Sequence, residues 1–454
     1  MAIDTYEQAL AYWLSRVDYE KIGMPKDVRT LHLGRMERLL ERLGNPQERL
    51  AIIHVAGTKG KGSTAALIAA VLQAAGYRTG LYTSPHLVHV EERIQINGTA
   101  IGPDELTRLM QRVEAAVNAV EAEGSQPVTF FEIITALSLL HFANQGVEQA
   151  VLEVGMGGRF DATNVCQPRV AVITSISFDH VAQLGPSLAD IAWAKAGIIK
   201  AGRPVVSGAC APEAQLVIRW VAKHLGAPLL ELNRDFTVAY QPGNLVRGQW
   251  PRVQLTDARG TGPWRELHLW GRHQAENAAL ALTVCAVLEK QGVQITDAAI
   301  DLGLRTVRWP ARLEVLQRRP WVVLDCAHNP ASVDATAAWF TSQIPARRRL
   351  LLLAVSRDKD LAGIIAALAP VFDQAYLTRF SSSQRAADPA LLADLWRQAG
   401  GRTVICHDRA ADALAAVQAA AHPDDALLVT GSVFLAGEVR PLLTTNANPG
   451  TKRG

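Results

Sequence analysis

The chain has few of the features that mark a membrane, secreted or nucleic-acid-binding protein. Its 454 residues contain no run of 18 apolar residues, so we expect no transmembrane helix. The first residues lack a basic stretch followed by an apolar segment, which is the pattern of a secretory signal. The net charge is only +3, too small to indicate nucleic acid or a membrane as a partner. These absences predict a soluble, cytoplasmic protein.

Cysteine is also scarce. The five cysteines are odd in number and widely spaced: Cys166, Cys210, Cys285, Cys326 and Cys406. This pattern fits a reduced compartment and argues against a disulfide framework or a cysteine-rich zinc module. There is no internal repeat, and the only segment that we expect to be disordered is the polar tail at 446–454.

The length and the order of apolar runs predict two α/β domains. At 454 residues the chain exceeds the size at which one hydrophobic core usually stops growing. Apolar runs at 51–56, 150–154 and 170–176 read as buried parallel strands of a first domain, and residues 228–270 as a small antiparallel flap. The pattern restarts after Trp309-Pro310, which predicts domains at 1–306 and 307–454.

The most informative segment is Gly57-Thr58-Lys59-Gly60-Lys61-Gly62-Ser63-Thr64. It lies between an apolar run and a helix-like segment at 65–75, and strand, glycine loop and helix together form a nucleoside triphosphate site. Lys61 is placed to neutralise the β- and γ-phosphates, and Ser63 or Thr64 to reach a phosphate or its Mg²⁺. Because Gly62 interrupts the usual Gly-Lys-Ser/Thr ending, a plain glycine turn is the alternative.

Polar residues follow several predicted strands. Glu153 ends the strand at 150–154, and in open α/β sheets ligands collect at the carboxyl ends of strands. Glu153 is therefore a candidate Mg²⁺ ligand, with a solvated acid beside a glycine turn as the alternative. Ser84 follows the strand near 78–82, where a simple Ser-Pro turn is equally possible. His180 follows the strand ending near Ile176, a position that favours a site over an ordinary surface histidine.

Lys195 lies in a largely apolar helix-like run at 188–199. A lysine in such a helix usually extends its ammonium group to water. The alternative is a buried lysine with a lowered pKa, whose neutral amine reacts with CO₂ to form a carbamate.

The second domain contributes polar groups after its first predicted strand, at 322–324. Asp325, His328 and Asn329 follow that strand, and Arg312 precedes it. A loop with an Asn-Pro helix start is the alternative to a site. The charged run at 357–360 is interpreted as a solvated loop.

Taken together, these segments resemble the folylpolyglutamate synthase/dihydrofolate synthase family of the Mur ligase superfamily, in its bifunctional bacterial form. The shared motifs occur in order along nearly the whole chain: GTKGKGST (57–64), TSPHL (83–87), TFFE (129–132), EVGMGGRFDATN (153–164), SFDH (177–180), KAGI (195–198), GRHQAENAALA (271–281), PARLE (310–314), DCAHNP (325–330), DKD (358–360) and GSVFLAGEVR (431–440).

The resemblance implies an N-terminal P-loop ATPase domain, a linker and a Rossmann-like C-terminal domain, with the active site in the cleft between them. It implies ATP and Mg²⁺ as cofactors, L-glutamate with dihydropteroate or reduced folates as substrates, and a monomer. A substrate carboxylate would attack the γ-phosphate of ATP, and the amine of glutamate would displace phosphate from the acyl phosphate. Phosphoryl transfer needs positioning and charge neutralisation more than a protein nucleophile.

The resemblance also implies roles for single residues. Nucleotide contacts are implied for Gly57, Thr58, Gly60, Lys61, Gly62, Ser63, Thr64, Asn277, Arg312 and Asp325. Magnesium contacts are implied for Ser63, Ser84, Glu153 and His180, and catalytic roles for Lys61, Lys195, His180 and Arg312, with Lys195 carbamylated. Phe131, Asp161 and Ala162 fall where the pterin packs, and His328 and Ser432 where the incoming glutamate binds.

The chain departs from the family pattern at four positions. Ala194 replaces a usual acid, and Lys59 replaces an asparagine common in bacterial members. Ala311 and Cys326 replace glycines, which a tight loop tolerates if those residues avoid positive φ.

Several functions stay open. The chain adds the first glutamate to dihydropteroate, extends folate glutamate chains, or does both. A peptidoglycan-type ligase would need a UDP-sugar domain before the P-loop, and about 50 residues are too few for one. A nucleotide-dependent switch would need no site for an acceptor amino acid, so it would not explain Arg312, Asp325 and His328.

Overall fold

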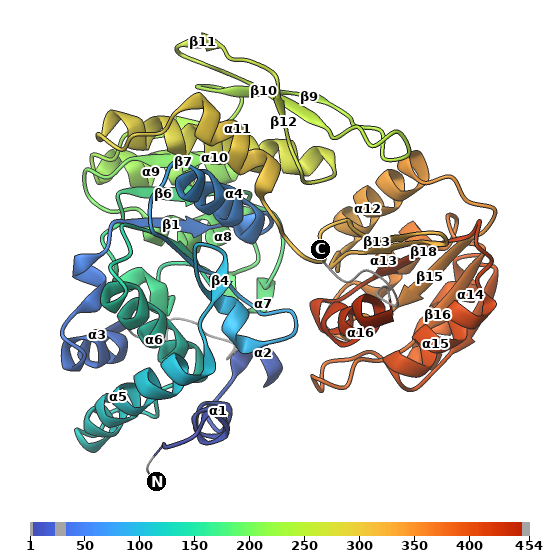
Figure 1. The fold of residues 1–454 in the computed structure, drawn as a ribbon, viewed down its shortest axis with the longest axis horizontal. Coiled ribbons are helices and arrows are strands. Elements are labelled where there is room, and N and C mark those ends of the chain that lie inside the picture. The colour runs from blue at the N-terminus through green and yellow to red at the C-terminus, as the bar shows by residue number, and fades with distance from the viewer. Residues whose placement is uncertain (1–2, 23–32, 447–454) are drawn as a thin grey trace, which may run out of the picture.

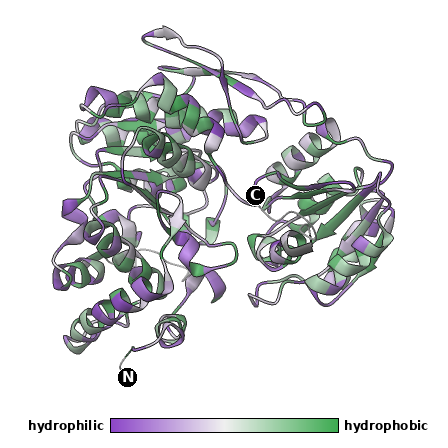
Figure 2. Cartoon of the chain, viewed as in Figure 1, coloured by the Kyte–Doolittle hydropathy of each residue, from purple (hydrophilic) through white to green (hydrophobic). Residues whose placement is uncertain are grey.

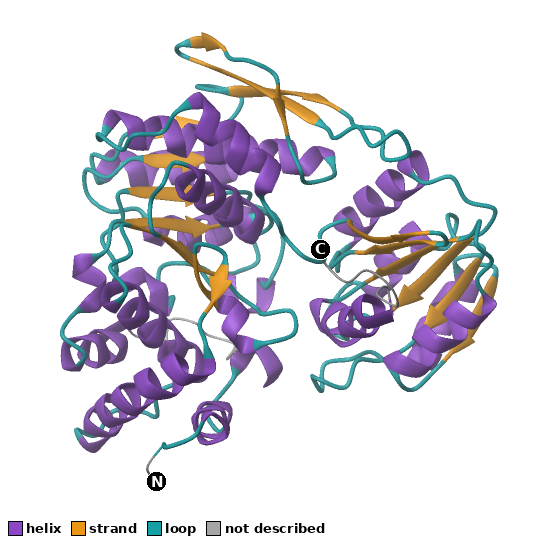
Figure 3. Cartoon of the chain, in the orientation of Figure 1, coloured by secondary structure: helices purple, strands orange, loops and turns teal. Residues whose placement is uncertain are grey.

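The computed structural model describes residues 3–22 and 33–446, which form helices, two large sheets and a small four-stranded sheet (Figures 1 and 3). An eight-stranded sheet belongs to the first half of the chain, and a six-stranded sheet to the last third. This confirms the predicted α/β class. The tail expected at 446–454 lies outside the described residues, except for Asn446, which ends the last helix.

The larger sheet has the strand order β4-β3-β2-β5-β1-β6-β7-β8. Its strands are β1 (Ile52–Ala56), β2 (Thr79–Tyr82), β3 (Ile94–Ile96), β4 (Thr99–Ala100), β5 (Gln149–Glu153), β6 (Val170–Ile173), β7 (Val205–Ser207) and β8 (Leu229–Glu231). Strands β3 and β4 are antiparallel and form one edge, whereas the other neighbours are parallel. Every residue of β1 and β5 is buried, as expected for parallel strands that are covered on both faces.

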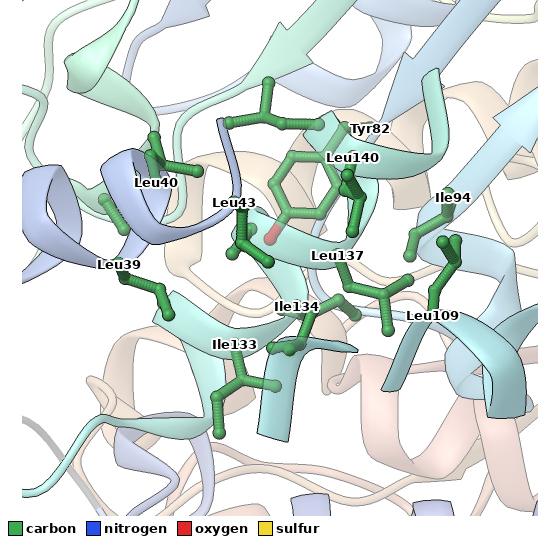
Figure 4. Close-up of a cluster of buried hydrophobic side chains, with 14 of the residues drawn as sticks. Leu39, Leu40, Leu43, Tyr82, Ile94, Leu109, Ile133, Ile134, Leu137 and Leu140 are labelled. Atoms are coloured by element: carbon green, nitrogen blue, oxygen red, sulfur yellow. The ribbon is translucent and has the colours of Figure 1, made fainter. Parts of the chain in front are cut away.

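Alternating side chains of the central strands enter different cores. Ile52 and Leu152 belong to a core with helices α1, α3, α5 and α6, whereas Ile53 and Val151 belong to a core with α4, α10 and α11. Figure 4 shows the first core, where leucines of α3 meet isoleucines and leucines of α6. Figure 2 shows that the strands inside each unit are largely hydrophobic, whereas the outer faces of the helices are hydrophilic.

The helices of this unit are α1 (Tyr6–Leu14), α2 (Tyr19–Ile22), α3 (Leu33–Arg42), α4 (Lys61–Ala74), α5 (Pro103–Ala122), α6 (Phe130–Asn144), α7 (Val181–Leu184), α8 (Leu188–Lys195), α9 (Pro212–His224), α10 (Arg272–Lys290) and α11 (Asp297–Thr306). Several begin with side-chain caps that satisfy free backbone N–H groups. The hydroxyl of Thr129 accepts the N–H of Glu132 at the start of α6, and Ser187 does the same for Asp190 at the start of α8.

The antiparallel flap is present but smaller than predicted. It contains β9 (Thr237–Gln241), β10 (Arg252–Asp257), β11 (Gly260–Thr261) and β12 (Arg265–Glu266). Residues 229–231, which we assigned to the flap, instead form β8 of the main sheet. The flap predicted up to residue 270 ends at Glu266, and Leu267, Leu269 and Trp270 are buried in an irregular segment.

The flap reaches across to the second unit (Figure 1). The backbone N–H of Leu245 donates to Oε1 of Gln343 at 3.2 Å. Trp250 stacks on Trp270 with ring centroids 4.8 Å apart, and Trp270 lies 5.7 Å from Trp339. Leu245 and Trp270 are both buried in the core of the smaller unit.

The smaller sheet has the order β13-β14-β18-β15-β16-β17. Its strands are β13 (Glu314–Arg318), β14 (Trp321–Leu324), β15 (Arg349–Leu353), β16 (Gln374–Leu377), β17 (Thr403–Cys406) and β18 (Ala426–Thr430), and its helices α12 (Pro330–Gln343), α13 (Leu361–Leu368), α14 (Pro389–Gln398), α15 (Ala410–Ala420) and α16 (Val433–Asn446). All pairs are parallel except β13, an antiparallel edge strand that the sequence did not predict.

The predicted division at residues 306 and 307 falls just after α11 and before β13, and it stays a prediction. Across the described residues, every helix is too short or too polar to traverse a lipid bilayer.

Candidate functional site

A cleft of about 1070 Å³ is lined by residues of both units. The predicted site residues on its walls are Gly62, Ser84, Phe131, Glu153, Asp161, Ala162, His180, Arg312, His328 and Ser432. The other predicted residues, among them Lys61, Ser63, Lys195, Asn277 and Asp325, are not among its lining residues. The cleft therefore brings together polar groups that lie up to several hundred positions apart in sequence.

The glycine-rich segment joins β1 to α4, as its pattern predicted. Helix α4 begins at Lys61, four residues earlier than expected, so Lys61 to Thr64 form its first turn instead of a loop. The N–H of Thr64 donates to the C=O of Gly60 at 2.9 Å, the first backbone bond of the helix. The amides of Lys61, Gly62 and Ser63 therefore have no partner within the helix, and such a helix start binds phosphate.

Two glycines of this segment are required by their surroundings. Gly60 has φ +83°, and a Cβ there would lie 2.2 Å from Oδ1 of Asn277. Gly57 has φ +150°, and its Cβ would lie 1.9 Å from Oγ1 of Thr174. The loop is therefore held tightly between β1, β6 and α10.

Helix α10 supports the start of α4 through a short polar network. Nε2 of Gln274 donates to Oγ of Ser63 at 3.3 Å, and Nδ2 of Asn277 donates to Oε1 of Gln274 at 2.9 Å. Thr64 Oγ1 donates to Oδ1 of Asn277 at 3.4 Å. Gln274 was missed from the sequence, although it belongs to the motif at 271–281.

Glu153 ends β5, next to the phosphate loop. It is 4% exposed, and one carboxylate oxygen accepts the N–H of Ser84 at 3.2 Å. Burial raises the pKa of Glu153 to about 6, against the positive charges of Lys61 and Arg312. Ser84 follows β2, the sheet neighbour of β5, so Ser84 and Glu153 both lie at the carboxyl edge of the sheet.

These oxygens suit Mg²⁺. No group of three His, Cys, Asp or Glu side chains that would enclose a metal exists in the part of the chain that the structure describes. Mg²⁺ is commonly held by one or two protein oxygens, with phosphates and water completing the shell. A single buried carboxylate with nearby hydroxyls fits that mode better than a protein-only cage.

Lys195 ends α8 and is 5% exposed. Its Nζ donates to the C=O of Gly57 at 2.8 Å, which ties α8 to the phosphate loop. Burial lowers the pKa of this ammonium group well below its usual value, and the nearby charge of Lys61 adds to the effect. The surroundings therefore favour the neutral amine that carbamylation requires.

Arg312 lies in a strained turn of the second unit. The residues on either side, Ala311 and Leu313, have φ +53° and +47°. The condition that a tight loop tolerates Ala311 if it avoids positive φ is therefore not met, whereas Cys326 is not among the described residues with positive φ. Asp325 holds this turn, because its carboxylate accepts the N–H of Leu313 at 2.9 Å.

The other contacts of Asp325 are also within the protein. It accepts the N–H of Ala327 at 2.8 Å and the hydroxyl of Thr336 at 3.0 Å. This carboxylate positions the Arg312 turn, and it is 5% exposed.

An ion-pair network crosses the cleft. Asp179 accepts from Lys59 at 2.8 Å and from Lys359 of the second unit at 3.0 Å. The side chain of Lys359 is 15% exposed, so the interpretation of residues 357–360 as a solvated loop is wrong for this residue. His180 lies beside the network, with Nε2 3.9 Å from Asp179.

His328 joins the same network. Its Nδ1 lies 2.8 Å from the C=O of Cys326, which can only accept, so Nδ1 carries the ring proton. Nε2 therefore accepts from Nζ of Lys59 at 2.9 Å. Burial lowers the pKa of His328 to about 3, and the two lysines add to this.

The residues implied for the pterin also line the cleft. Phe131 lies against Gly155, where an added Cβ would be 2.6 Å from its ring, and Asp161 and Ala162 are further lining residues. Ser432 follows β18, and its Oγ accepts the N–H of Phe434 at 3.1 Å.

Residues near the N-terminus also line the cleft, a role that sequence reasoning missed. Glu20 binds the buried Arg93 through both carboxylate oxygens, and Arg35 binds Glu132. Arg385 of the second unit donates to the C=O of Glu20 at 3.2 Å. Weak helical patterning before residue 33 gave no signal for this role.

Comparison with known proteins agrees with this architecture. Residues 55–285 match the Mur ligase middle domain, and residues 311–433 match the Mur ligase glutamate ligase domain. The chain is 35% identical over 416 residues to the dihydrofolate synthase/folylpolyglutamate synthase of Bacillus subtilis (strain 168), which covers 90% of this chain and 94% of that protein. It is 37% identical over 439 residues to the protein of the same name from Mycobacterium tuberculosis, covering 90% and 89%.

Solved structures are equally similar. The folylpolyglutamate synthase of Mycobacterium tuberculosis complexed with ADP and AMPPCP matches with a TM-score of 0.86 at 35% identity, covering 98% of this chain and 99% of that one. The E. coli FolC in complex with DHPP and ADP matches with a TM-score of 0.84 at 29% identity, covering 99% and 100%. The chain therefore belongs to the dihydrofolate synthase/folylpolyglutamate synthase family of Mur ligases, the ATP-dependent glutamate ligases.

Proposed function

We propose that this chain joins L-glutamate to dihydropteroate and also extends the glutamate chain of reduced folates. The observation that carries the proposal is the cleft itself, in which Glu153 beside the phosphate loop faces Arg312 and His328 of the second unit. A nucleotide switch would need only the first unit. A ligase needs both, because an activated acyl group must meet an amine.

The chemistry proceeds in two displacements. A carboxylate oxygen of the pteridine substrate attacks the γ-phosphorus of ATP, and the bond to ADP breaks. The glutamate nitrogen, after losing a proton, then attacks the acyl carbon, and the carbon–oxygen bond to phosphate breaks. Lys61 and the amides at the start of α4 would bind the phosphates, and Arg312, which lines the cleft, would stabilise negative charge on the transferring group.

Magnesium would be held by Ser63, Ser84 and Glu153, and it would neutralise phosphate charge when bound. Glu153 is the only carboxylate of the three, and Ser63 is held in place by Gln274. His180 is the weakest member of the predicted set, because its nitrogen is a poorer magnesium ligand than oxygen.

Carbamylation of Lys195 is part of the proposal. The neutral amine would attack CO₂ and lose a proton, and the carbamate would keep one N–H for the C=O of Gly57. The new negative charge would lie near Lys61, which contributes to the lowered pKa of the amine. Intact-protein mass spectrometry in bicarbonate and in CO₂-free buffer tests this step, and activity that is identical in both buffers would contradict it.

Substrate positions follow from the walls of the cleft. The pteridine ring would pack on Phe131 with Asp161 and Ala162, and the incoming glutamate would bind near His328 and Ser432. We further propose a cytoplasmic location and a monomer. All five cysteines are free, which supports a reducing compartment.

One experiment separates the candidate functions. The purified protein is given ATP, Mg²⁺ and glutamate with either dihydropteroate or tetrahydrofolate, and mass spectrometry records which acceptor gains a glutamyl unit. We expect both to gain one. Product from tetrahydrofolate alone would indicate a monofunctional folylpolyglutamate synthase, and phosphate release without glutamate would favour a nucleotide switch.

A further inference from the structure

Four side chains form a hydrogen-bonded series from the cleft to β1. Asp161 lines the cleft, and its Oδ1 accepts the hydroxyl of Thr163 at 2.5 Å. Oγ1 of Thr163 lies 2.8 Å from Nε2 of His54, in the middle of β1. Nδ1 of His54 lies 3.6 Å from Sγ of Cys166. Thr163, His54 and Cys166 are at most 1% exposed, so these groups must satisfy one another.

Only one order of donors suits an ionised Asp161. A carboxylate accepts but does not donate, so Thr163 gives its single hydroxyl proton to Asp161. The hydroxyl oxygen must then accept an N–H from His54, which places the ring proton on Nε2. Burial lowers the pKa of His54 to about 3, so the ring is neutral. Nδ1 is therefore left to accept the thiol of Cys166.

A protonated Asp161 would reverse every donor in the series. Burial raises the pKa of Asp161, and its hydrogen bonds to Thr163, Met156 and Gly155 oppose that rise. The N–H of Thr163 reaches Oδ1 at 3.0 Å, and the N–H of Met156 reaches Oδ2 at 3.0 Å. The hydroxyl and the N–H of Thr163 and the N–H of Met156 thus donate to the two carboxylate oxygens, and these hydrogen bonds favour the ionised form. The tautomer of His54 reports which order exists.

We propose that His54 and Thr163 are positioning residues that hold Asp161 as an ionised hydrogen-bond acceptor for the N–H groups of a pteridine ring. The inference rests on the proposed function, because that function puts the ring beside Phe131 and Asp161. A pterin presents an amino group and a ring N–H side by side, which matches the two acceptor oxygens of a carboxylate. His54 acts only through Thr163, since it does not line the cleft.

The test compares two substitutions at His54. His54→Phe keeps a ring of similar shape without a donor, whereas His54→Gln retains an amide N–H close to the position of Nε2. We expect His54→Phe to raise KM for tetrahydrofolate about tenfold, with KM for ATP and glutamate changed less than twofold. His54→Gln should recover most of that loss. His141→Phe, at another buried histidine outside the series, is the matched control.

A second variant and a spectrum keep the result clear. If His54→Phe does not fold, Thr163→Val removes the hydroxyl at nearly constant volume and should give the same selective rise in KM. Nitrogen-15 NMR of histidine-labelled protein should show His54 protonated at Nε2. An Nδ1–H tautomer, or an unchanged pteridine KM in a folded Thr163→Val protein, would overturn the proposal. An unmutated protein that glutamylates neither acceptor would instead count against the proposed function, and the NMR result would still decide the donor order.

Discussion

Lys61 is the residue on which we expect nucleotide chemistry to depend most directly. It begins α4 immediately after Gly60, beside amides that have no partner within the helix. Replacing it with alanine removes the charge that, under the proposed function, neutralises the β- and γ-phosphates. We expect Lys61→Ala to lower ATP-dependent product formation at least about a thousandfold. The thermal midpoint should shift by no more than a few degrees, since no buried contact is lost.

Phosphate release and circular dichroism measure these two effects. Lys223→Ala is a suitable control, because Lys223 is exposed on α9. A Lys61→Ala protein that keeps the unmutated rate would exclude the phosphate loop from the mechanism.

We expect Glu153 to make the magnesium requirement depend on pH. Its pKa of about 6 means that the carboxylate is largely ionised at pH 7.5 and mostly protonated at pH 5.5. Protons compete with the cation, so the Mg²⁺ concentration for half-maximal activity should rise about fourfold at the lower pH. Titration of activity with Mg²⁺ at both values measures this shift.

The Glu153→Gln variant is the reference for that titration. It cannot ionise, so it should need more Mg²⁺ at every pH and lose the extra dependence below pH 6. An identical metal titration in the variant and the unmutated protein would remove Glu153 from the ligand set.

At the residue scale, Glu153 and Arg312 could be predicted as residues of the cleft, Glu153 because it ends a buried strand and Arg312 through the family resemblance. The ion-pair partners of Asp179 could not be predicted from the sequence. Lys359 meets Asp179 across 180 positions of sequence, and only the packing of the two units brings them together. An isolated charged run gives no sign of such pairing.

At the scale of elements, the sequence predicted the buried strands well and the irregular pieces poorly. Apolar runs such as 150–154 identify β5 because both of its faces are covered. The start of α4 was misplaced because glycine has a low helix propensity, yet Gly62 lies in the first turn, closely packed by Trp309 and Glu153. Residues 267–270 are apolar like a strand but are buried without a ladder partner.

The turn around Arg312 gives a prediction about backbone strain. Ala311 is fully buried with φ +53°, a conformation that β-branched residues adopt only at a high cost. Ala311→Val should destabilise the fold by about 2–3 kcal/mol, through strain and added volume. Ala311→Gly should stay within about 1 kcal/mol, because relief of strain offsets the greater freedom of the unfolded chain. Chemical denaturation of both variants measures this, and equal midpoints would contradict the assigned backbone conformation.

At the scale of the whole molecule, the pair between Asp179 and Lys359 is a charge contact across the cleft. Both side chains are at most 15% exposed, so salt screens the pair only partly. Lys359→Ala removes the partner of Asp179 in the second unit and should weaken the contact between the units by about 1–2 kcal/mol. Small-angle X-ray scattering should then show a larger radius of gyration without substrates.

Lys359→Arg is the conservative comparison and should keep the compact form, since it preserves the charge. Scattering curves of Lys359→Ala that superimpose on those of the unmutated protein would show that other contacts hold the units together.

The flap has a consequence for how the chain can be divided. A fragment that starts at residue 307 would contain every strand of the six-stranded sheet, yet it would leave Leu245 and Trp270 behind. Trp339 would lose its indole neighbour, and a void would open beneath α12. The core of the second unit is therefore incomplete without side chains of the first. We expect that the two units do not fold separately and that the protein melts in a single step.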